Sequence, residues 1–199
     1  MVEGVPNTPV RMPLWNKVLF ASDHIGLQAI SYFRQAWILF FLVPPADEGP
    51  ARVPDVSVLG FEIDARLFAG IVIGLGRFLD AFTDPLIGWW TDRTHTRWGR
   101  RIPFILFSTP FYALFAALVW FLPVEEASIW NLIFLVIVLE LFLTAHTMSS
   151  GALEALVPEV TRGASDRNNL VGFIFVLAIV GAVISLGGGG ILVDRFGFR

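Results

Sequence analysis

The sequence predicts an all-α, polytopic membrane protein that crosses the bilayer five times. Of its 199 residues, 55% are hydrophobic and only 16% are charged, and the mean hydropathy is +0.69. Soluble domains carry about 25% charged residues, so this chain lacks the polar surface needed to face water on all sides. Its apolar residues gather into five runs of about 20, the length that spans the hydrocarbon core. These observations exclude a soluble globular enzyme and a disordered chain.

Two further bulk properties narrow the function classes. The net charge of -3 argues against a nucleic-acid-binding protein, because such domains are usually strongly basic. The sequence contains no cysteine, which excludes disulfides, thiolate metal ligands and cysteine nucleophiles.

The five helices are predicted from the apolar runs and from the polar breaks between them. The first run ends at Pro44-Pro45, since a proline pair cannot continue a helix. The second leads into a basic loop over 91–101, the third ends at Pro123 and an acidic turn, and a polar connection over 162–169 follows the fourth. The predicted helices cover about 18–43, 66–90, 102–122, 130–151 and 170–193.

The distribution of Lys and Arg predicts that the N-terminus is cytoplasmic. Basic residues gather in the N-terminal tail, in the cytoplasmic loop 91–101 and in 162–169, whereas the other loops hold mostly carboxylates. Cytoplasmic loops of membrane proteins carry the excess of Lys and Arg. The first 17 residues lack the apolar core of a cleavable signal peptide. We therefore expect an integral protein of the plasma (inner) membrane.

Several charged residues lie inside the predicted helices, where a charge at the bilayer centre costs about 2.5–3.5 kcal/mol on insertion scales. In the second helix, Arg77, Asp80, Asp84 and Gly88 share one face at 100° per residue. A face that carries three charges looks into a helix bundle or a wet cavity rather than at lipid.

The pair Asp80 and Asp84 predicts a site for a small cation or a proton. The two carboxylates are i, i+4 neighbours, and Pro85 leaves the carbonyl of Ala81 without its usual helical donor. Such hard oxygen atoms suit a cation. Arg77, one turn away, could balance the charge when the cation leaves. In the alternative interpretation Arg77 only pairs with Asp80 to fix the helices, which leaves Asp84 unexplained.

The first and fourth helices carry weaker signals of the same kind. Asp23 is either part of a ligand site or interfacial, and Arg34, on the same face, could reach the interface with its long side chain. Glu140 and Thr147 belong to a polar stripe of the fourth helix. Thr147 is expected at the membrane depth of Asp84, where its hydroxyl either completes a cation site or bonds to its own helix.

Two glycine clusters predict close contacts between helices. Gly70-x-x-x-Gly74, followed by Gly76, lets another helix approach the second one. The run of four glycines over 187–190 indicates a bend or a tight contact.

The stretch 76–101 contains two motifs, Arg-x-x-Asp-Ala-x-x-Asp-Pro-x-x-Gly over 77–88 and Arg-Trp-Gly-Arg-Arg over 97–101. It closely resembles the second helix and following loop of the glycoside–pentoside–hexuronide:cation symporters, the melibiose-permease-like branch of the major facilitator superfamily. The stretch 156–161 also resembles the end of that family's fourth helix. The resemblance implies five helices of the six-helix N-terminal half. We therefore expect residues 1–199 to form a partial N-terminal helical bundle whose C-terminal helices are missing.

The resemblance also implies which residues form the site. Asp80 and Asp84 take the place of the coupling-cation carboxylates, which are metal ligands if the cation is Na⁺, and Thr147 takes that of the hydroxyl joining them. Asp23 matches a sugar-binding carboxylate, and Ser150 stands where melibiose-permease-like members have a second sugar-contacting aspartate. The expected substrate-binding residues are therefore Asp23, Arg77 and Ser150.

The same resemblance implies a conformational latch at the loop 91–101. Its charges would link helix ends and separate when the transporter rocks between conformations. The expected latch residues are Gly88, Asp92, Arg93, Gly99, Arg100 and Arg101.

We therefore expect a secondary active transporter that symports a small solute, a sugar or a glycoside, with Na⁺ or H⁺ by alternating access. The expected partners are the lipid bilayer, the solute and the missing C-terminal helices, with no cofactor, catalytic residue or nucleic acid. One alternative is a same-family transporter of an amphipathic solute such as a lysolipid, and another is a non-transporting membrane sensor. A membrane prenyl- or phosphatidyl-transferase would need aspartate-rich motifs beyond Asp80 and Asp84, and only Asp92 follows them.

Overall fold

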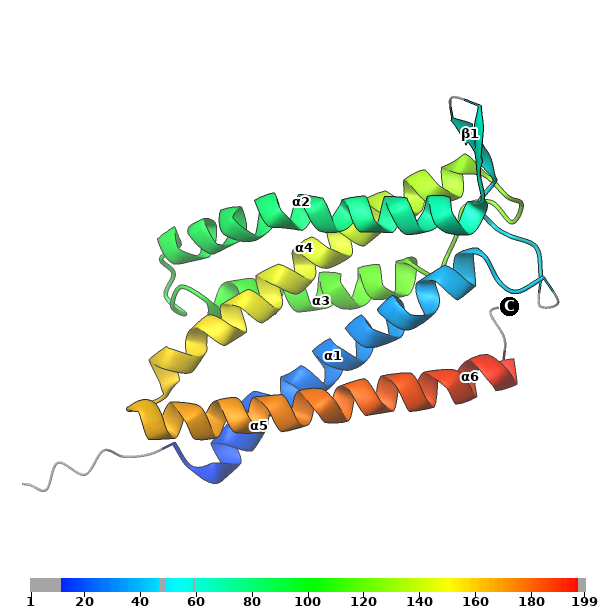
Figure 1. Ribbon diagram of the computed structural model, residues 1–199. Helices are drawn as coiled ribbons and strands as arrows, with labels where there is room; N and C mark the ends of the chain where they lie inside the picture. The colour runs from blue at the N-terminus through cyan, green and yellow to red at the C-terminus, as the bar shows by residue number, and fades with distance from the viewer. Residues whose placement is uncertain (1–11, 47–48, 59, 197–199) are drawn as a thin grey trace, which may run out of the picture.

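The structure is a computed structural model that describes residues 12–46, 49–58 and 60–196. Long helices dominate it, which confirms the all-α prediction (Figure 1). The elements are α1 (Leu14–Leu42), β1 (Val56–Val58), β2 (Phe61–Ile63), α2 (Ala65–Arg93), α3 (Ile102–Leu118), α4 (Ile129–Val160) and α5 (Ala164–Val183), followed by a π-helical segment (Ile184–Gly188) and α6 (Gly189–Phe196). Figure 1 shows α5 and α6 as one continuous rod.

Within the described residues, three helices are long and apolar enough to cross a membrane by themselves. They cover Leu14–Leu42, Ile129–Val160 and Ala164–Val193. Helix α3 is apolar but has 17 residues, and α2 has 29 residues but includes the charges at 77, 80 and 84. A charged helix in such a protein depends on its neighbours to cover its polar face.

Several helix ends differ from the prediction, among them the following three. Helix α4 continues to Val160 rather than 151, α5 begins at Ala164 rather than 170, and α3 ends at Leu118 rather than 122. The prediction looked for apolar spans of about 20 residues, but a helix can continue beyond the hydrocarbon. At about 1.5 Å per residue, a 32-residue helix is about 48 Å long against a core of about 30 Å.

Capping residues explain where several helices start. The Asp64 carboxylate accepts hydrogen bonds from the Arg66 and Leu67 backbone N–H groups at 2.6 and 2.9 Å, which satisfies free donors at the start of α2. Ser128 accepts from the Trp130 N–H at 3.2 Å at the start of α4. Gly163 has a φ of 89°, a left-handed conformation that suits glycine and lets the chain turn from α4 into α5.

A small hairpin between α1 and α2 was not predicted. Strands β1 and β2 are antiparallel, with Val56 opposite Ile63 and Ser57 opposite Glu62. The β-branched residues favour strands, but carboxylates flank them, so the stretch looked like a polar loop in sequence.

The helices form two main pairs, α1 with α5 and α3 with α4, while α2 packs on α4. Buried side chains form two apolar clusters. The first apolar cluster lies toward the hairpin end, and the second apolar cluster lies further along the bundle. The first contains Ile38, Phe41, Leu42, Val53, Ala65, Ala69, Val119, Leu132, Leu135 and Val138. The second contains Leu27, Tyr112, Leu139, Phe142, Leu143, Ala145 and Leu153.

The glycine predictions are partly wrong. A Cβ at Gly70 or Gly74 would meet no described atom within 4 Å, so the close contact expected there is not found. On α2 it is Gly76 that lies against another helix, because a Cβ there would come 2.5 Å from the Glu140 carboxylate oxygen. In the run 187–190, Gly189 lies tightly against Phe33 and Trp37 of α1.

Substitution of Gly181 by alanine is expected to destabilise the α1–α5 pair. A Cβ at this position would collide with the backbone carbonyl of Ile25, and backbone cannot move aside as a flexible side chain can. Overpacking of this kind costs about 1–3 kcal/mol. We expect a lower thermal unfolding midpoint in detergent. Gly172→Ala on the same helix, where nothing lies within 4 Å, should leave the midpoint unchanged or raise it; equal midpoints for the two variants would contradict the contact.

Candidate functional site

The predicted carboxylate pair lies on one stretch of α2. Arg77 Nη1 is 3.9 Å from Asp80 Oδ2, too long for a hydrogen bond. The Arg77 side chain is 53% exposed, whereas that of Asp80 is 17% exposed. The ion pair considered in the sequence therefore exists as a loose contact, and Asp80 keeps carboxylate oxygen atoms for another partner.

Asp84 is joined to α4 by a direct hydrogen bond. The Thr147 hydroxyl donates to Asp84 Oδ1 at 2.9 Å, although the two residues are 63 positions apart. This contact agrees with the expectation that Thr147 lies at the depth of Asp84. It brings a hydroxyl oxygen and two carboxylates into one region of the α2–α4 interface.

This donor set suits a proton or an alkali cation better than a transition metal. Oxygen ligands favour hard cations, whereas transition metals are usually held by nitrogen and sulfur ligands as well. No cluster of three or more His, Cys, Asp or Glu side chains able to hold a metal ion occurs among the described residues. The role of Asp80, Asp84 and Thr147 in cation binding stays a prediction.

The predicted substrate-binding residues are more scattered. Asp23 is exposed on α1, and Ser150 is half-buried on α4. Neither side chain forms a hydrogen bond or an ion pair with a described residue, in contrast to that of Asp84. Arg77 lies on α2 next to Asp80. The structure therefore does not join these three positions to one another, and their role in substrate binding also stays a prediction.

The predicted latch residues Arg100 and Arg101 converge on a residue that was not predicted. Arg100 Nη2 and Arg101 Nε both donate to Glu159 Oε1, at 2.9 and 3.0 Å. Arg101 also contacts Asp92 Oδ1 at 3.4 Å. The cluster ties the end of α2 and the start of α3 to the end of α4. Glu159 lies just after Pro158 in the stretch 156–161. The resemblance of that stretch to the family's fourth helix was the sequence signal that could have identified it.

Three other latch positions, Gly88, Arg93 and Gly99, make local contacts in or next to the loop. Gly99 has a φ of 93°, and the Thr96 hydroxyl donates to its carbonyl at 2.7 Å. Arg93 lies over the Trp89 ring, with its Cζ 4.2 Å from the ring centroid. The Gly88 carbonyl accepts from the Thr91 hydroxyl at 2.9 Å. Of these, only Gly99 is explained by backbone conformation.

Replacing Glu159 with glutamine is expected to loosen the latch. The variant removes the charge that two arginines share, and exposed charge-assisted bonds contribute about 0.2–1 kcal/mol each. We expect faster trypsin cleavage after Arg100 and Arg101 in detergent. Glu154→Gln, an exposed residue of the same helix, is the matched control and should be cleaved like the wild type. Equal cleavage of all three proteins would show that Glu159 does not restrain the loop.

A second charged contact joins α1 and α5 near the same end. Lys17 Nζ lies 2.6 Å from Asp166 Oδ1, and both side chains are buried, 8% and 2% exposed. Asp166 Oδ2 also accepts from the Met12 and Arg162 backbone N–H groups at 3.3 and 3.4 Å. The sequence analysis placed Lys17 and Asp166 in polar segments outside the predicted helices. Because they are far apart in the chain, no local sequence pattern indicates that they pair.

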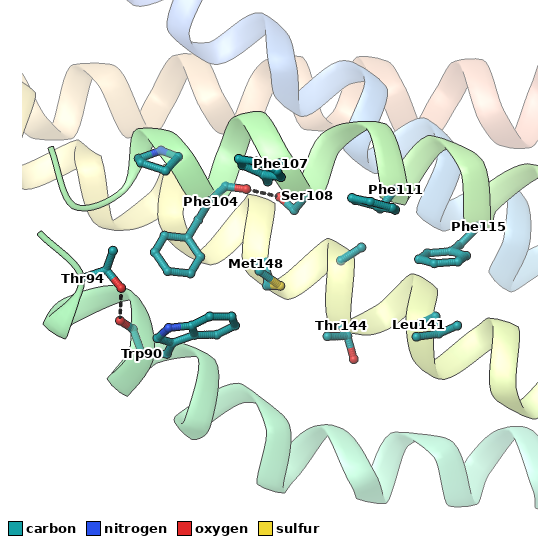
Figure 2. A pocket seen from close by; sticks show the side chains of 12 residues that line it. Trp90, Thr94, Phe104, Phe107, Ser108, Phe111, Phe115, Leu141, Thr144 and Met148 are labelled. Carbon is teal, nitrogen blue, oxygen red and sulfur yellow. Dashed lines mark hydrogen bonds between the residues drawn. The ribbon is translucent and has the colours of Figure 1, made fainter. Parts of the chain in front are cut away.

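An apolar cavity of about 430 Å³ lies between α2, α3 and α4 (Figure 2). Its lining includes Trp90, Phe104, Phe107, Phe111 and Met148, and no charged residue. The cavity does not include Asp80, Asp84 or Thr147. The apolar cavity and the carboxylate region are therefore separate features.

Comparisons with known proteins agree with the resemblance seen in the sequence. Residues 19–198 match the family described as MFS/sugar transport protein. The chain is 36% identical over 152 residues to an uncharacterised symporter of Synechocystis sp., covering 70% of this chain and 28% of that protein. It is 32% identical over 184 residues to sodium-dependent lysophosphatidylcholine symporter 1-B of Danio rerio, covering 89% and 31%. It is 30% identical over 118 residues to the inner membrane symporter YicJ of Escherichia coli, covering 59% of this chain and 25% of that protein.

The chain thus spans less than a third of the length of each of these relatives. The family match, in contrast, extends over almost all of this chain. It agrees with the motifs in 76–101, and three helices of the described residues are long and apolar enough to cross a bilayer. The chain is an integral membrane protein that belongs to the MFS/sugar transport protein family of the major facilitator superfamily.

Proposed function

We propose that this chain is part of a secondary active transporter that symports a small solute with Na⁺ or H⁺. One observation carries the proposal: the Thr147 hydroxyl meets the Asp84 carboxylate at 2.9 Å, one helical turn from Asp80. Two carboxylates inside a membrane helix are costly without a positive partner. A coupling cation is the partner that a symporter supplies.

The mechanism follows from this charge balance. Cation binding at Asp80, Asp84 and Thr147 neutralises the carboxylate face, which lowers the cost of closing the protein around the site. Solute then binds beside it, with Asp23, Arg77 and Ser150 as the residues of this chain that contact it. Rocking of the two halves exposes the site to the other side, while the contacts of Arg100 and Arg101 with Glu159 break and re-form.

The proposed topology places the N-terminus and the latch in the cytoplasm of a plasma (inner) membrane. The excess of Lys and Arg in 91–101 supports this orientation. The chain would form the N-terminal bundle, and the helices that complete the solute site would belong to the rest of the transporter. The chain covers only 24% and 31% of the lengths of the lysophosphatidylcholine symporters of Xenopus tropicalis and Danio rerio, which supports this division.

The first candidate solute is a sugar or a glycoside, which the family description supports. A lysolipid is the second candidate. The Danio rerio relative is named as a sodium-dependent lysophosphatidylcholine symporter and matches 89% of this chain. An acyl chain is also the kind of group that an apolar cavity of about 430 Å³ accommodates.

Uptake by the complete transporter in proteoliposomes tests the proposal. Inward gradients of Na⁺ or H⁺ are imposed separately while radiolabelled glycosides and a lysophospholipid are offered as solutes. We expect one gradient to drive accumulation above the external concentration for one solute class. Equal uptake with and without every gradient would contradict symport, and no uptake above that of protein-free liposomes would favour the non-transporting sensor.

A further inference from the structure

Arg34 lies between the two apolar clusters of the bundle. It follows Leu27 of the second apolar cluster by seven residues and precedes Ile38 of the first by four, so all three lie on one face of α1. Ile73 of α2 packs against both clusters, and Gly76, Arg77 and Asp80 follow it. The hydrophobic core is therefore interrupted by charge at the level of Arg34.

The Arg34 side chain is a buried cation without an anion of its own. The residue is 5% exposed, and its Nε has no hydrogen-bond partner. In the part of the chain that the structure describes, Arg34 makes no ion pair, whereas Lys17, Arg100 and Arg101 do. Its Cζ lies 5.1 Å from the centroid of the Phe142 ring. A ring contact holds the guanidinium in place but does not neutralise it.

The positive charge of Arg34 acts on the site proposed for the coupling cation. Asp80 interacts electrostatically with Arg34, with Arg77 and with Asp84, and Asp80 in turn acts on Glu140 of α4. On α4, His146 interacts with Arg34, Arg77 and Asp84 together. Because Arg34 is buried, water and salt screen its charge less than that of the half-exposed Arg77. Arg34 therefore adds a fixed positive charge to the electrostatic environment of Asp80, one of the proposed cation ligands.

We propose that Arg34 is a built-in competitor of the coupling cation, whose fixed positive charge lowers the affinity of the Asp80–Asp84 site. The inference rests on the proposed function. A buried positive charge near the carboxylates, in addition to the exposed Arg77, weakens their attraction for a cation and favours its release. Arg34 is a positioning residue in this scheme, since it acts through Asp80 and does not touch the ion.

The test measures cation affinity in four proteins. NaCl is titrated into the detergent-solubilised complete transporter at constant ionic strength, with choline as the balancing ion, by calorimetry and by the Na⁺-dependent shift of the unfolding midpoint. The variants are Arg34→Met, which removes the charge, and Arg34→Lys, which keeps it. Arg97→Met is the matched control, because Arg97 lies over Trp98 at the same 5.1 Å but is exposed in the loop. Arg34→Gln replaces the methionine variant if that one does not fold.

We expect Arg34→Met to bind Na⁺ roughly 10- to 20-fold more tightly than the wild type. Coulomb's law gives an effect of this size for one unit charge if the separation is taken as about 10 Å and the effective dielectric constant as about 20. Arg34→Lys and Arg97→Met should stay within about threefold of the wild type. If Na⁺ gives no response in the wild type, the series is titrated with protons, and the midpoint should rise by about one pH unit in Arg34→Met.

Two results would overturn the inference while leaving symport intact. In the first, the wild type binds the cation and Arg34→Met binds it equally well. In the second, Arg34→Met binds it less tightly, which would mean that Arg34 supports the site. A wild type that responds to neither Na⁺ nor protons contradicts the proposed function itself, and the inference with it.

Discussion

Replacing Asp84 with asparagine is expected to abolish cation-driven accumulation of the solute by the complete transporter. The amide oxygen of asparagine can still accept the Thr147 hydroxyl, which bonds Asp84 at 2.9 Å, so the α2–α4 contact should persist. The negative charge is lost, however. At about 4 Å and an effective dielectric constant of about 20, one charge contributes about 4 kcal/mol to cation binding. We therefore expect cation affinity to fall at least about a hundredfold.

The measurement is uptake into proteoliposomes under the driving gradient, together with solute exchange without a gradient. Exchange should survive in Asp84→Asn while accumulation falls to the passive level. Glu62→Gln is the matched control, because it also removes one carboxylate but lies exposed on β2. Accumulation in Asp84→Asn equal to that of Glu62→Gln would remove Asp84 from the coupling site.

Replacing Asp166 with asparagine is expected to cause the largest loss of stability among the substitutions considered. Lys17 would be left as a buried charge, 8% exposed, without the carboxylate that now lies 2.6 Å away. Breaking one member of a buried pair is far more harmful than removing both, because the remaining charge has no partner. The midpoint of thermal unfolding should fall at least twice as far as in Gly181→Ala.

The double variant Lys17→Met/Asp166→Leu separates this explanation from a general intolerance of the position. It should recover most of the lost midpoint, since apolar side chains can fill a buried site without a charge. Arg167→Gln, on the neighbouring exposed residue, should behave as the wild type. A double variant no more stable than Asp166→Asn would mean that the backbone bonds of Asp166, rather than its pairing with Lys17, hold α1 and α5 together.

The fold was largely predictable because bilayer-spanning helices can be recognised from their runs of about 20 apolar residues. The order and number of the long helices follow from apolar runs and from breaks such as Pro44-Pro45. Their ends did not follow, because α4 continues for nine residues past Gly151, beyond the length of about 20 residues that crosses the hydrocarbon. That extension matters, since it carries Glu159 to Arg100 and Arg101.

The site was predictable where its residues lie on one helix. Arg77, Asp80 and Asp84 share a face through helical periodicity alone, and the family resemblance pointed to Thr147. The contact of Gly76 with Glu140 replaced the one expected at Gly70 and Gly74. Which glycine on a helix faces a neighbour depends on how the helices are rotated, and sequence spacing does not contain that rotation.

The sequence by itself determined that this is a membrane protein, that it has five long helices, and that one of them carries a charged face. These properties depend on local composition and on the fixed period of the helix. Only the tertiary structure decided which charges meet: Lys17 with Asp166, Arg100 and Arg101 with Glu159, and Asp84 with Thr147. It also decided that Arg34 is buried without an ion pair among the described residues. Such pairings join residues far apart in the chain, and they depend on the approach and rotation of whole helices.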